Sequence, residues 1–265
     1  MNKNSHICIG KNFGGINIQG DDIFIYSSFF PNISYRFNRT AKLIWDEIEK
    51  NNSINGIVDA LNKKYPGIDD TKKRQDLFLI LKKLWIKGFV DFSDYNPFLC
   101  EYSYIFENEL QINKIIFANC DSYLKTNFDK SAILNAYIPL SKAVDPSIVN
   151  TELYHNITCI YTLNNASEIL ASICFSVDEP NGIVNINYIS CNTTTNLMHN
   201  FIKKSIELEL LSLNINSTLV SKFVTVFIIS KNSDHIDQLN TFGFELDSEL
   251  KKETRTGNAL LFTLL

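Results

Sequence analysis

The spacing of apolar and polar positions along the chain predicts one folded segment between residues 33 and 92. Apolar residues there change from strand spacing to helical spacing, and back to strand spacing at the end. Three helices are predicted. Asn38 can cap the first turn of the first helix, and Ser53 starts the second. Asp69 and Asp70 place negative charge at the start of the third, where the helix macrodipole favours it. Gly88 follows the third pattern and predicts its end.

The residues before these helices predict β-structure. β-Branched and aromatic runs at 7–9, 16–18 and 23–26 are separated by glycine-rich turns, and a further run covers 33–37. We therefore expect an antiparallel sheet of about three strands ahead of the helices.

The third helix is apolar around most of its circumference, which exceeds what one core face requires. One stripe is predicted to face the core: Leu77, Ile80 and Leu84. An adjacent stripe contains Arg74, Phe78, Leu81 and Trp85. This second stripe either lines a groove for a peptide or packs on the domain that follows, and the spacing leaves both open.

Three motifs in this region resemble the PqqD-like family, the RiPP recognition elements that bind leaders of ribosomally made, modified peptides. They are FN-RTA-x-x-IW from Phe37 to Trp45, SINGIVDALNKKY over 53–65 and DLFLILKKLWIKGFV over 76–90. The resemblance implies a winged-helix-like domain in which the leader adds as a strand beside residues 33–37 and lies against the third helix. The peptide-binding residues it implies are Ile33, Tyr35, Phe37, Arg74, Phe78, Leu81 and Trp85. A winged-helix domain with another partner is the alternative.

The second part of the chain alternates strand and helix patterns. Strands are predicted at 114–118, 157–162, 169–177, 183–191, 223–230 and 258–264, and helices at 197–213 and 232–242. A turn at 94–97 and aromatic residues without helical period separate this part from the first. We therefore expect an α+β protein with domains 1–93 and 112–265 joined by a connector, 94–111.

The end of the chain resembles the GNAT acyltransferase family, and the likeness extends over residues 112–265. The motif is SKNSDHIDQLNTFGFELD, in which Asn232 opens a helix and Gly243–Phe244 closes it. The resemblance implies a mixed α/β domain that takes acetyl-CoA or a longer acyl-CoA, without a metal. On the matching positions the cofactor-binding residues are Ser190, Thr193, Thr194, Thr195 and Asn232.

Three positions depart from the family pattern. Thr193 and Thr195 stand where the family has glycines that let backbone amides approach a pyrophosphate, and β-branched residues resist such a turn. These threonines can equally be ordinary helix caps. Leu239 stands where a tyrosine often protonates the departing thiolate. The catalytic residues are therefore unknown; the nearest bases by sequence are Glu179, His199 and His235.

Charge and composition narrow the function classes. Residues 1–93 carry fourteen Lys and Arg against ten Asp and Glu, whereas residues 94–265 carry eleven against nineteen. A mildly basic first domain suits an acidic peptide better than DNA. A DNA-binding regulator stays open through the basic residues of the third helix: Lys72, Lys73, Arg74, Lys82, Lys83 and Lys87.

Hydropathy and cysteine spacing favour a cytoplasmic location for the protein. No run of eighteen apolar residues predicts a membrane span, and the first ten residues lack the apolar core of a signal peptide. The six cysteines are scattered without a CxxC pair, so neither a disulfide framework nor a zinc site is expected.

Together these patterns predict a protein of RiPP biosynthesis that binds a precursor leader and N-acylates the core peptide, that is, a GNAT-type N-acyltransferase. The alternative is a non-catalytic adaptor, whose second domain docks a partner modifying enzyme or a second copy of the chain. Nucleic acid and membrane are not expected partners.

Overall fold

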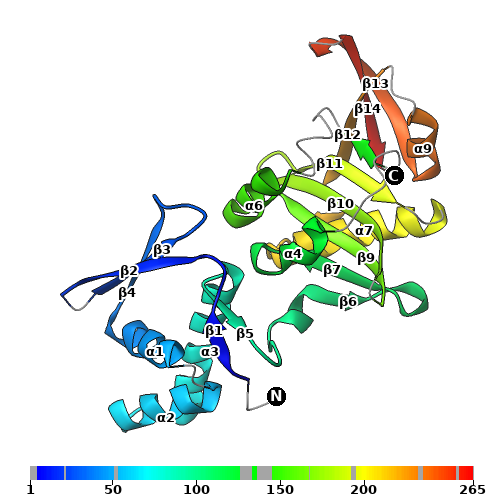
Figure 1. The fold of residues 1–265 in the computed structure, drawn as a ribbon. Helices are drawn as coiled ribbons and strands as arrows, with labels where there is room; N and C mark the ends of the chain where they lie inside the picture. Colours follow the sequence, from blue (N-terminus) through cyan, green and yellow to red (C-terminus); the bar gives the residue numbers. More distant parts are fainter. Residues whose placement is uncertain are drawn as a thin grey trace. The chain divides into compact units, whose positions relative to one another are not determined.

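A computed structural model describes residues 5–20, 22–50, 53–125, 133–135, 145–166, 168–191, 195–231, 235–254 and 257–264. The chain forms two compact units, Met1–Glu101 and Tyr102–Leu265, and each is described by itself. Their boundary lies inside the predicted connector, 94–111. No helix in the described ranges is both long and apolar enough to span a membrane. The mixed α+β class is confirmed (Figure 1).

The first unit contains the predicted three-stranded antiparallel sheet. Its strands are β2 (Phe13–Gln19), β3 (Asp22–Ser27) and β4 (Ser34–Phe37), in the order β2-β3-β4. A separate two-stranded sheet pairs β1 (Ile7–Ile9) with β5 (Val90–Phe92). The strand after the last helix therefore pairs with the first strand of the chain.

The three predicted helices form and begin where the sequence pattern predicts. They are α1 (Arg39–Glu49), α2 (Ile54–Lys64) and α3 (Asp70–Ile86). The side chains of Asn38, Ser53 and Asp69 each accept a hydrogen bond from a first-turn backbone N–H, at 3.0, 3.2 and 3.1 Å respectively. Gly88 follows α3 with a φ of 70°, a left-handed conformation that favours glycine.

Helices α1 and α2 each bury one apolar face. In α1 the buried residues are Ala41, Ile44, Trp45 and Ile48, and in α2 they are Ile54, Ile57, Val58 and Leu61. The buried face of α3 differs from the predicted one, because the helix is rotated about its axis relative to the prediction. Its buried apolar residues are Leu77, Leu81, Leu84 and Trp85, whereas Ile80 is only half-buried. The spacing could not fix this rotation because α3 is apolar on several sides.

The second unit is built on one large sheet. In the described ranges the sheet runs β13-β14-β12-β11-β10-β9-β7-β6, with β8 paired to β11. The strands are β6 (Ser103–Ile105), β7 (Gln111–Ile115), β8 (Ile133–Asn135), β9 (Cys159–Asn165), β10 (Glu168–Asp178), β11 (Ile183–Cys191), β12 (Val224–Ser230), β13 (Phe244–Thr254) and β14 (Gly257–Leu264). Sequence patterns predicted β7, β9, β10, β11, β12 and β14 within a few residues, and missed β6, β8 and β13.

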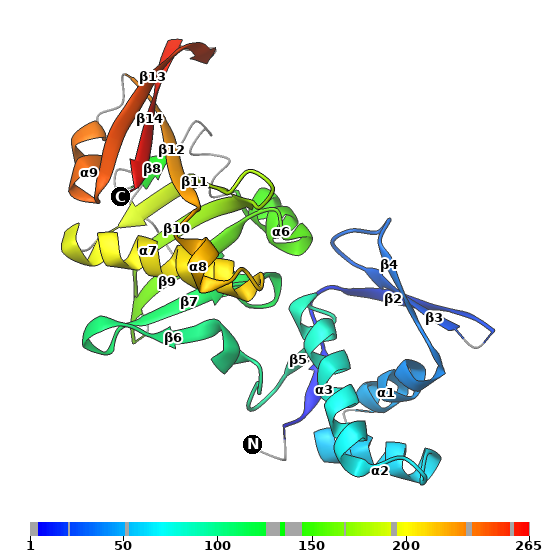
Figure 2. The same cartoon turned by 180° about the vertical axis from the view of Figure 1, so that it is seen from behind.

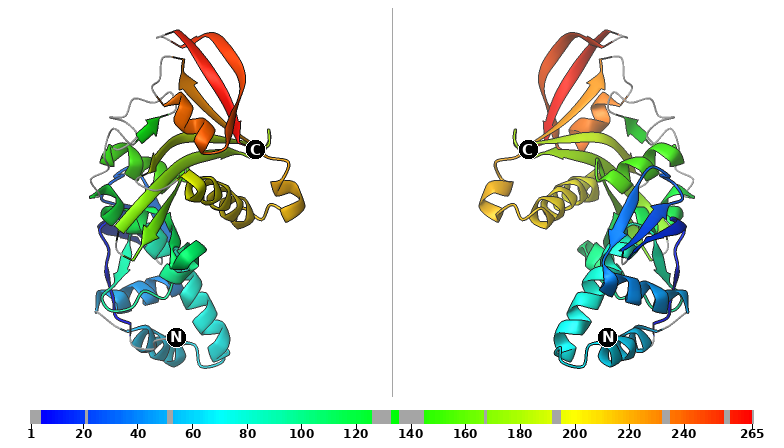
Figure 3. Two further views of the ribbon diagram at one scale, coloured as in Figure 1. Left: turned by 90° about the vertical axis from the view of Figure 1, so that its right-hand side faces the viewer. Right: turned by 90° about the vertical axis from the view of Figure 1, so that its left-hand side faces the viewer.

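Helices pack on this sheet, as Figures 2 and 3 show. They are α4 (Cys120–Leu124), α6 (Pro146–His155), α7 (Thr195–Ser212) and α9 (Ile236–Thr241). A short further helix, α8 (Ser217–Val220), contacts α7. The predicted helices 197–213 and 232–242 correspond to α7 and α9. Met198, Phe201 and Ile202 of α7 are fully buried in the main apolar core against strands β9 and β10. Short 3-10 helices lie at Leu99–Tyr102, Glu107–Glu109 and Phe117–Asn119.

Candidate functional site

A groove of about 610 Å³ lies in the first unit between β4 and α3. The residues that line it come from both elements and from the turn that follows α3: Tyr35, Arg36, Phe37, Asn38, Ala41, Ile80, Lys83, Leu84, Ile86, Lys87 and Phe89. The floor is mainly apolar, and the Tyr35 and Phe89 rings meet edge to face with centroids 5.3 Å apart. Such a channel suits a segment that offers apolar side chains at intervals.

β4 is an edge strand in the described part of the first unit, because only β3 pairs with it. The backbone N–H of Ser27 donates to the Ile33 carbonyl at 3.2 Å, which sets the alternation of the ladder. Tyr35 and Phe37 therefore direct their backbone groups to β3, and Ser34 and Arg36 direct theirs to the open edge. The groove thus has two N–H and two C=O groups along one wall.

Asn12 fixes the end of α3 to the sheet. Its side-chain amide donates to the Lys87 carbonyl at 2.8 Å, and its own N–H donates to the Gly88 carbonyl at 2.8 Å. On the sheet side, the Ser27 hydroxyl donates to Asn12 Oδ1 at 2.5 Å. Because Asn12 is fully buried, these bonds are shielded from water and set the separation of α3 from β3 and β4. No sequence motif identified this residue.

The charged residues that line the groove are Arg36, Lys83 and Lys87. Arg36 is held by Asp22 on the neighbouring strand, with 2.6 Å between Nη2 and Oδ2. Lys83 and Lys87 lie one turn apart on α3 and at its end. Desolvation by burial lowers the pKa of Lys87 below its ordinary value, so a carboxylate beside this ammonium would be favourable.

The structure separates the predicted peptide-binding residues into three groups. Tyr35 and Phe37 line the β4–α3 groove, and Ile33 lies just before β4. Arg74 and Phe78 line a second groove of about 870 Å³ on another side of α3. The remaining two, Leu81 and Trp85, are 0% and 2% exposed and belong to the core.

The Phe98 ring accounts for part of this arrangement. It stacks on Trp85, with centroids 5.7 Å apart, and meets Phe78 edge to face at 5.9 Å. Phe98 follows β5 within the first unit, so its own chain covers the stripe that was predicted either to bind a peptide or to pack. The helix face that meets β4 is instead Ile80, Lys83, Leu84 and Lys87.

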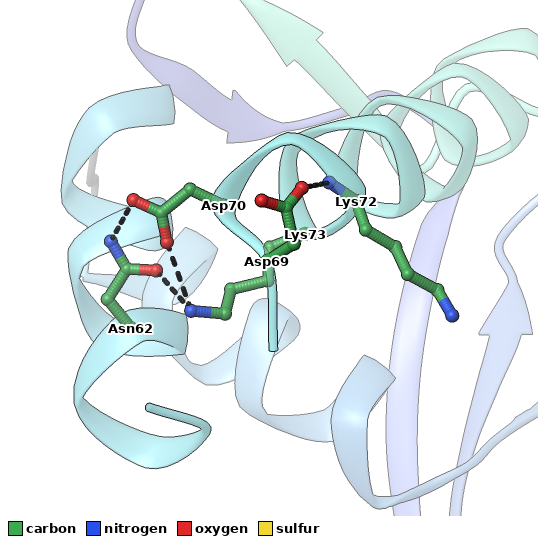
Figure 4. Close-up of polar contacts among 5 residues, drawn as sticks. All are labelled: Asn62, Asp69, Asp70, Lys72 and Lys73. Carbon is green, nitrogen blue, oxygen red and sulfur yellow. Dashed lines mark hydrogen bonds and ion pairs between the residues drawn. The ribbon is translucent and has the colours of Figure 1, made fainter. Parts of the chain in front are cut away.

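The other basic residues of α3 are held in separate contacts. Lys73 is turned inward, and its ammonium donates to Asn62 Oδ1 at 2.7 Å and to Asp70 Oδ1 at 3.1 Å (Figure 4). Lys82 forms an ion pair with Glu101. The basic side chains that kept a DNA-binding regulator open are therefore not gathered on one helix face.

The candidate cofactor region of the second unit lies where β11 and β12 diverge. These parallel strands pair only over Ile183–Ile186 and Val224–Phe227. Beyond that point Tyr188, Ile189 and Ser190 of β11 pair with β8. Ser190 is buried on β11 and Thr195 opens α7, whereas Thr193, Thr194 and Asn232 lie outside the described residues.

The described residues in this region do not fit an acyl-CoA. A cofactor would need backbone amides on the edge of β11 beyond its pairing with β12. The backbone of β8 pairs with that edge instead. The loop that leads into α7 has no glycine, so a close backbone approach to a pyrophosphate is resisted. Leu239, at the position of the family's tyrosine, is fully buried in the apolar core.

The three nearest bases do not converge on this edge. Nδ1 of His199 lies 2.9 Å from the Phe242 carbonyl, and the ring fills the space beside Gly243. Glu179 lies in the turn between β10 and β11, at the far end of β11 from Ser190. His235 immediately precedes α9.

Sequence reasoning missed a buried polar cluster beside the β11 edge. The hydroxyls of Tyr123 and Tyr188 are hydrogen-bonded to one another, and burial raises the pKa of both phenols. Burial also raises the pKa of the neighbouring Cys174 thiol to about 12. These groups stay protonated at neutral pH. The available signal was Ser172, Cys174 and Ser176 at alternate positions of the otherwise mainly apolar strand β10. No group of three His, Cys, Asp or Glu in the described ranges could hold a metal ion.

Comparisons with known proteins identify partial structural likeness alone. No protein-family model matches the chain, and no curated protein matches it in sequence. A ribosomal-protein-S5-alanine acetyltransferase from Vibrio fischeri aligns over 62% of this chain and 96% of its own, with 15% identity and a TM-score of 0.42. A probable acetyltransferase from Staphylococcus epidermidis aligns over 59% and 99%, with 15% identity and a TM-score of 0.41.

A third similar structure is a GNAT family acetyltransferase from Elizabethkingia anophelis with acetyl-CoA bound. It aligns over 60% of this chain and 99% of its own, with 13% identity and a TM-score of 0.37.

Proposed function

We propose that the chain binds the leader of a ribosomally made precursor peptide in the β4–α3 groove, as a RiPP recognition element does. One observation carries this proposal: the edge of β4 is open along a groove with a mainly apolar floor. An extended peptide beside Ser34 and Arg36 would continue the β2-β3-β4 sheet and direct alternate side chains at α3. The three PqqD-like sequence motifs support the same assignment.

Strand addition explains how such a site combines affinity with selectivity. Each backbone hydrogen bond contributes about 0.5–1.5 kcal/mol net, irrespective of the peptide sequence. Selectivity then comes from the groove, where Ile80, Leu84 and Phe89 receive side chains. Asn12 holds both walls at a fixed separation, so little ordering is needed on binding.

Substitution of Ser34 by proline tests this function, because proline removes an N–H that faces the open edge and is tolerated in edge strands. The probes are dodecapeptides selected from a random displayed library on the wild-type protein. We expect Ser34→Pro to weaken their binding at least about tenfold, and the matched Ser34→Ala to leave it nearly unchanged. Equal affinity for Ser34→Pro and wild type, or a library without binders, would overturn the proposal.

For the second unit we propose the adaptor role, in which it docks a partner modifying enzyme or a second copy of the chain. The observation that favours this role is the pairing of β8 with Tyr188–Ser190, which occupies the edge a cofactor would use. Capture of the leader by the first unit would then raise the concentration of the core peptide at the docked enzyme.

N-acylation of the core peptide from acyl-CoA is the second candidate function. It is favoured by the divergence of the parallel strands β11 and β12 ahead of α7, and it requires β8 to leave the β11 edge before a cofactor could pair there. Titration with acetyl-CoA distinguishes the adaptor role from acyl transfer.

A further inference from the structure

The β4–α3 groove is lined by basic residues without a carboxylate among its described lining residues. The positive charge of the groove comes from Arg36, which is paired with Asp22, and from the ammonium groups of Lys83 and Lys87. The second groove beside α3 differs, because Asp70 and Glu101 line it together with Arg74 and Lys82. Of these two grooves beside α3, the β4–α3 groove is the one whose described lining carries positive charge alone, and it therefore selects for an anionic occupant.

The spacing of the two lysines matches the repeat of a β-strand. Lys87 follows Lys83 by four positions, and four positions along an α-helix correspond to a rise of about 6 Å. Side chains on one face of an extended peptide recur every second residue, about 6.6–6.8 Å apart. A strand that pairs with β4 can therefore place one carboxylate near each ammonium from positions i and i+2.

The apolar part of the same helix face supplies the next position. Ile80 lies one turn before Lys83 and Leu84, and it is half-buried with its remaining surface in the groove. A third side chain on the same face of the peptide, two residues beyond the carboxylate that meets Lys83, would meet Ile80. An apolar side chain there would bury against Ile80 and the Phe37 ring, at about 25 cal/mol per Å² of apolar surface.

We propose that the groove selects an extended peptide with two acidic residues at positions i and i+2, followed or preceded at the next same-face position by an apolar residue. This inference rests on the proposed function, because it specifies the peptide that the β4 edge accepts. Lys87 is half-buried, and in a partly buried position a carboxylate beside its ammonium makes a charge-assisted hydrogen bond that favours the charged form.

Parallel selections from one random dodecapeptide library test this selectivity. The library is selected on the wild-type protein, on Lys83→Glu/Lys87→Glu, and on the control Lys63→Glu/Lys64→Glu. The control makes the same change of charge at exposed residues in the last turn of α2. We expect wild type and control to enrich Asp/Glu-x-Asp/Glu, and the groove variant to enrich Lys/Arg-x-Lys/Arg. Circular dichroism checks that each variant is folded.

Affinity measurements then separate this inference from the function on which it rests. Replacing both acidic residues of a selected peptide by Asn or Gln should weaken its binding to wild type at least about tenfold. If selected peptides depend on the Ser34 edge but carry no acidic pair, the charge selectivity is wrong and the peptide-binding function stands. If no selected peptide is sensitive to Ser34→Pro, both are wrong.

Discussion

The side-chain amide of Asn12 donates a hydrogen bond to the backbone carbonyl of Lys87 at 2.8 Å, across 75 positions of sequence. This bond joins the turn before β2 to the C-terminal end of α3. Lys87 is also one of the two lysines that face the groove, so Asn12 positions a residue proposed to contact the peptide. The relationship links the stability of the first unit to the geometry of its groove.

Replacing Asn12 by alanine should therefore destabilise the first unit. The change removes the bond to the Lys87 carbonyl and leaves the Ser27 hydroxyl without its acceptor, in a fully buried site. We expect a loss of about 2–3 kcal/mol in the free energy of unfolding. Urea denaturation followed by tryptophan fluorescence measures it selectively, because Trp45 and Trp85 both lie in the first unit.

The matched control for this change is Asn17→Ala, an exposed asparagine on β2. It should change the free energy of unfolding by less than about 0.5 kcal/mol. Equal effects of the two substitutions would show that the Asn12 bonds contribute little.

The second unit contains a buried ion pair that ties α7 to the sheet. Lys114 Nζ lies 2.5 Å from Glu209 Oε2, which also accepts a bond from the Tyr161 hydroxyl at 2.8 Å. Glu209→Gln should cost about 2–3 kcal/mol, because it leaves the largely buried Lys114 ammonium without its counter-charge. Far-UV circular dichroism during urea denaturation measures the loss. The control Glu207→Gln breaks a surface pair with Lys204 and should cost less than about 0.5 kcal/mol.

The stability of the second unit should decrease in alkaline solution. Burial raises the pKa of Cys174 to about 12 from an ordinary value of 9.0, so between these pH values the unfolded chain has released a proton that the folded unit still holds. The contribution of Cys174 is complete below pH 9 and falls by about 1.4 kcal/mol per pH unit above it. Cys174→Ala should flatten this decline between pH 9 and 11, measured by circular dichroism in urea, whereas Cys100→Ala at an exposed site should leave it unchanged.

Calorimetric titration with acetyl-CoA distinguishes the two roles of the second unit. Because β8 pairs with Tyr188–Ser190, we expect the wild-type protein to show no binding in the micromolar range. Leu134→Pro removes a backbone donor from β8 and serves as the companion variant. Micromolar binding by the wild type would contradict the adaptor role and favour acyl transfer; binding by the variant alone would show that β8 occupies a cofactor edge.

Local signals in the sequence predicted much of the first unit. Asn38, Ser53 and Asp69 were predicted at the starts of the three helices, and each accepts a hydrogen bond from a first-turn N–H. Cap chemistry depends on a side chain and a backbone amide two or three residues away, so no knowledge of the tertiary structure is needed.

Features that depend on long-range packing could not be predicted in the same way. The rotation of α3 is set by Phe98, which covers Trp85 from a segment without a clear pattern. The role of Asn12 depends on Lys87 and Ser27, and the obstruction of the β11 edge depends on the pairing of the short strand β8. The PqqD-like resemblance implied strand addition beside 33–37, but the lysine-bearing face of α3 emerged only from the fold.

Hydrogen exchange at Ser34 and Arg36 tests the central claim most directly. Both backbone N–H groups face the open edge of β4, and a peptide that adds as a strand must accept hydrogen bonds from them. Exchange is measured by NMR with and without a library-selected dodecapeptide at saturation. We predict that exchange of these two amides slows at least about tenfold. Unchanged exchange at both amides, with a saturated peptide protecting other parts of the protein, would contradict strand addition at β4.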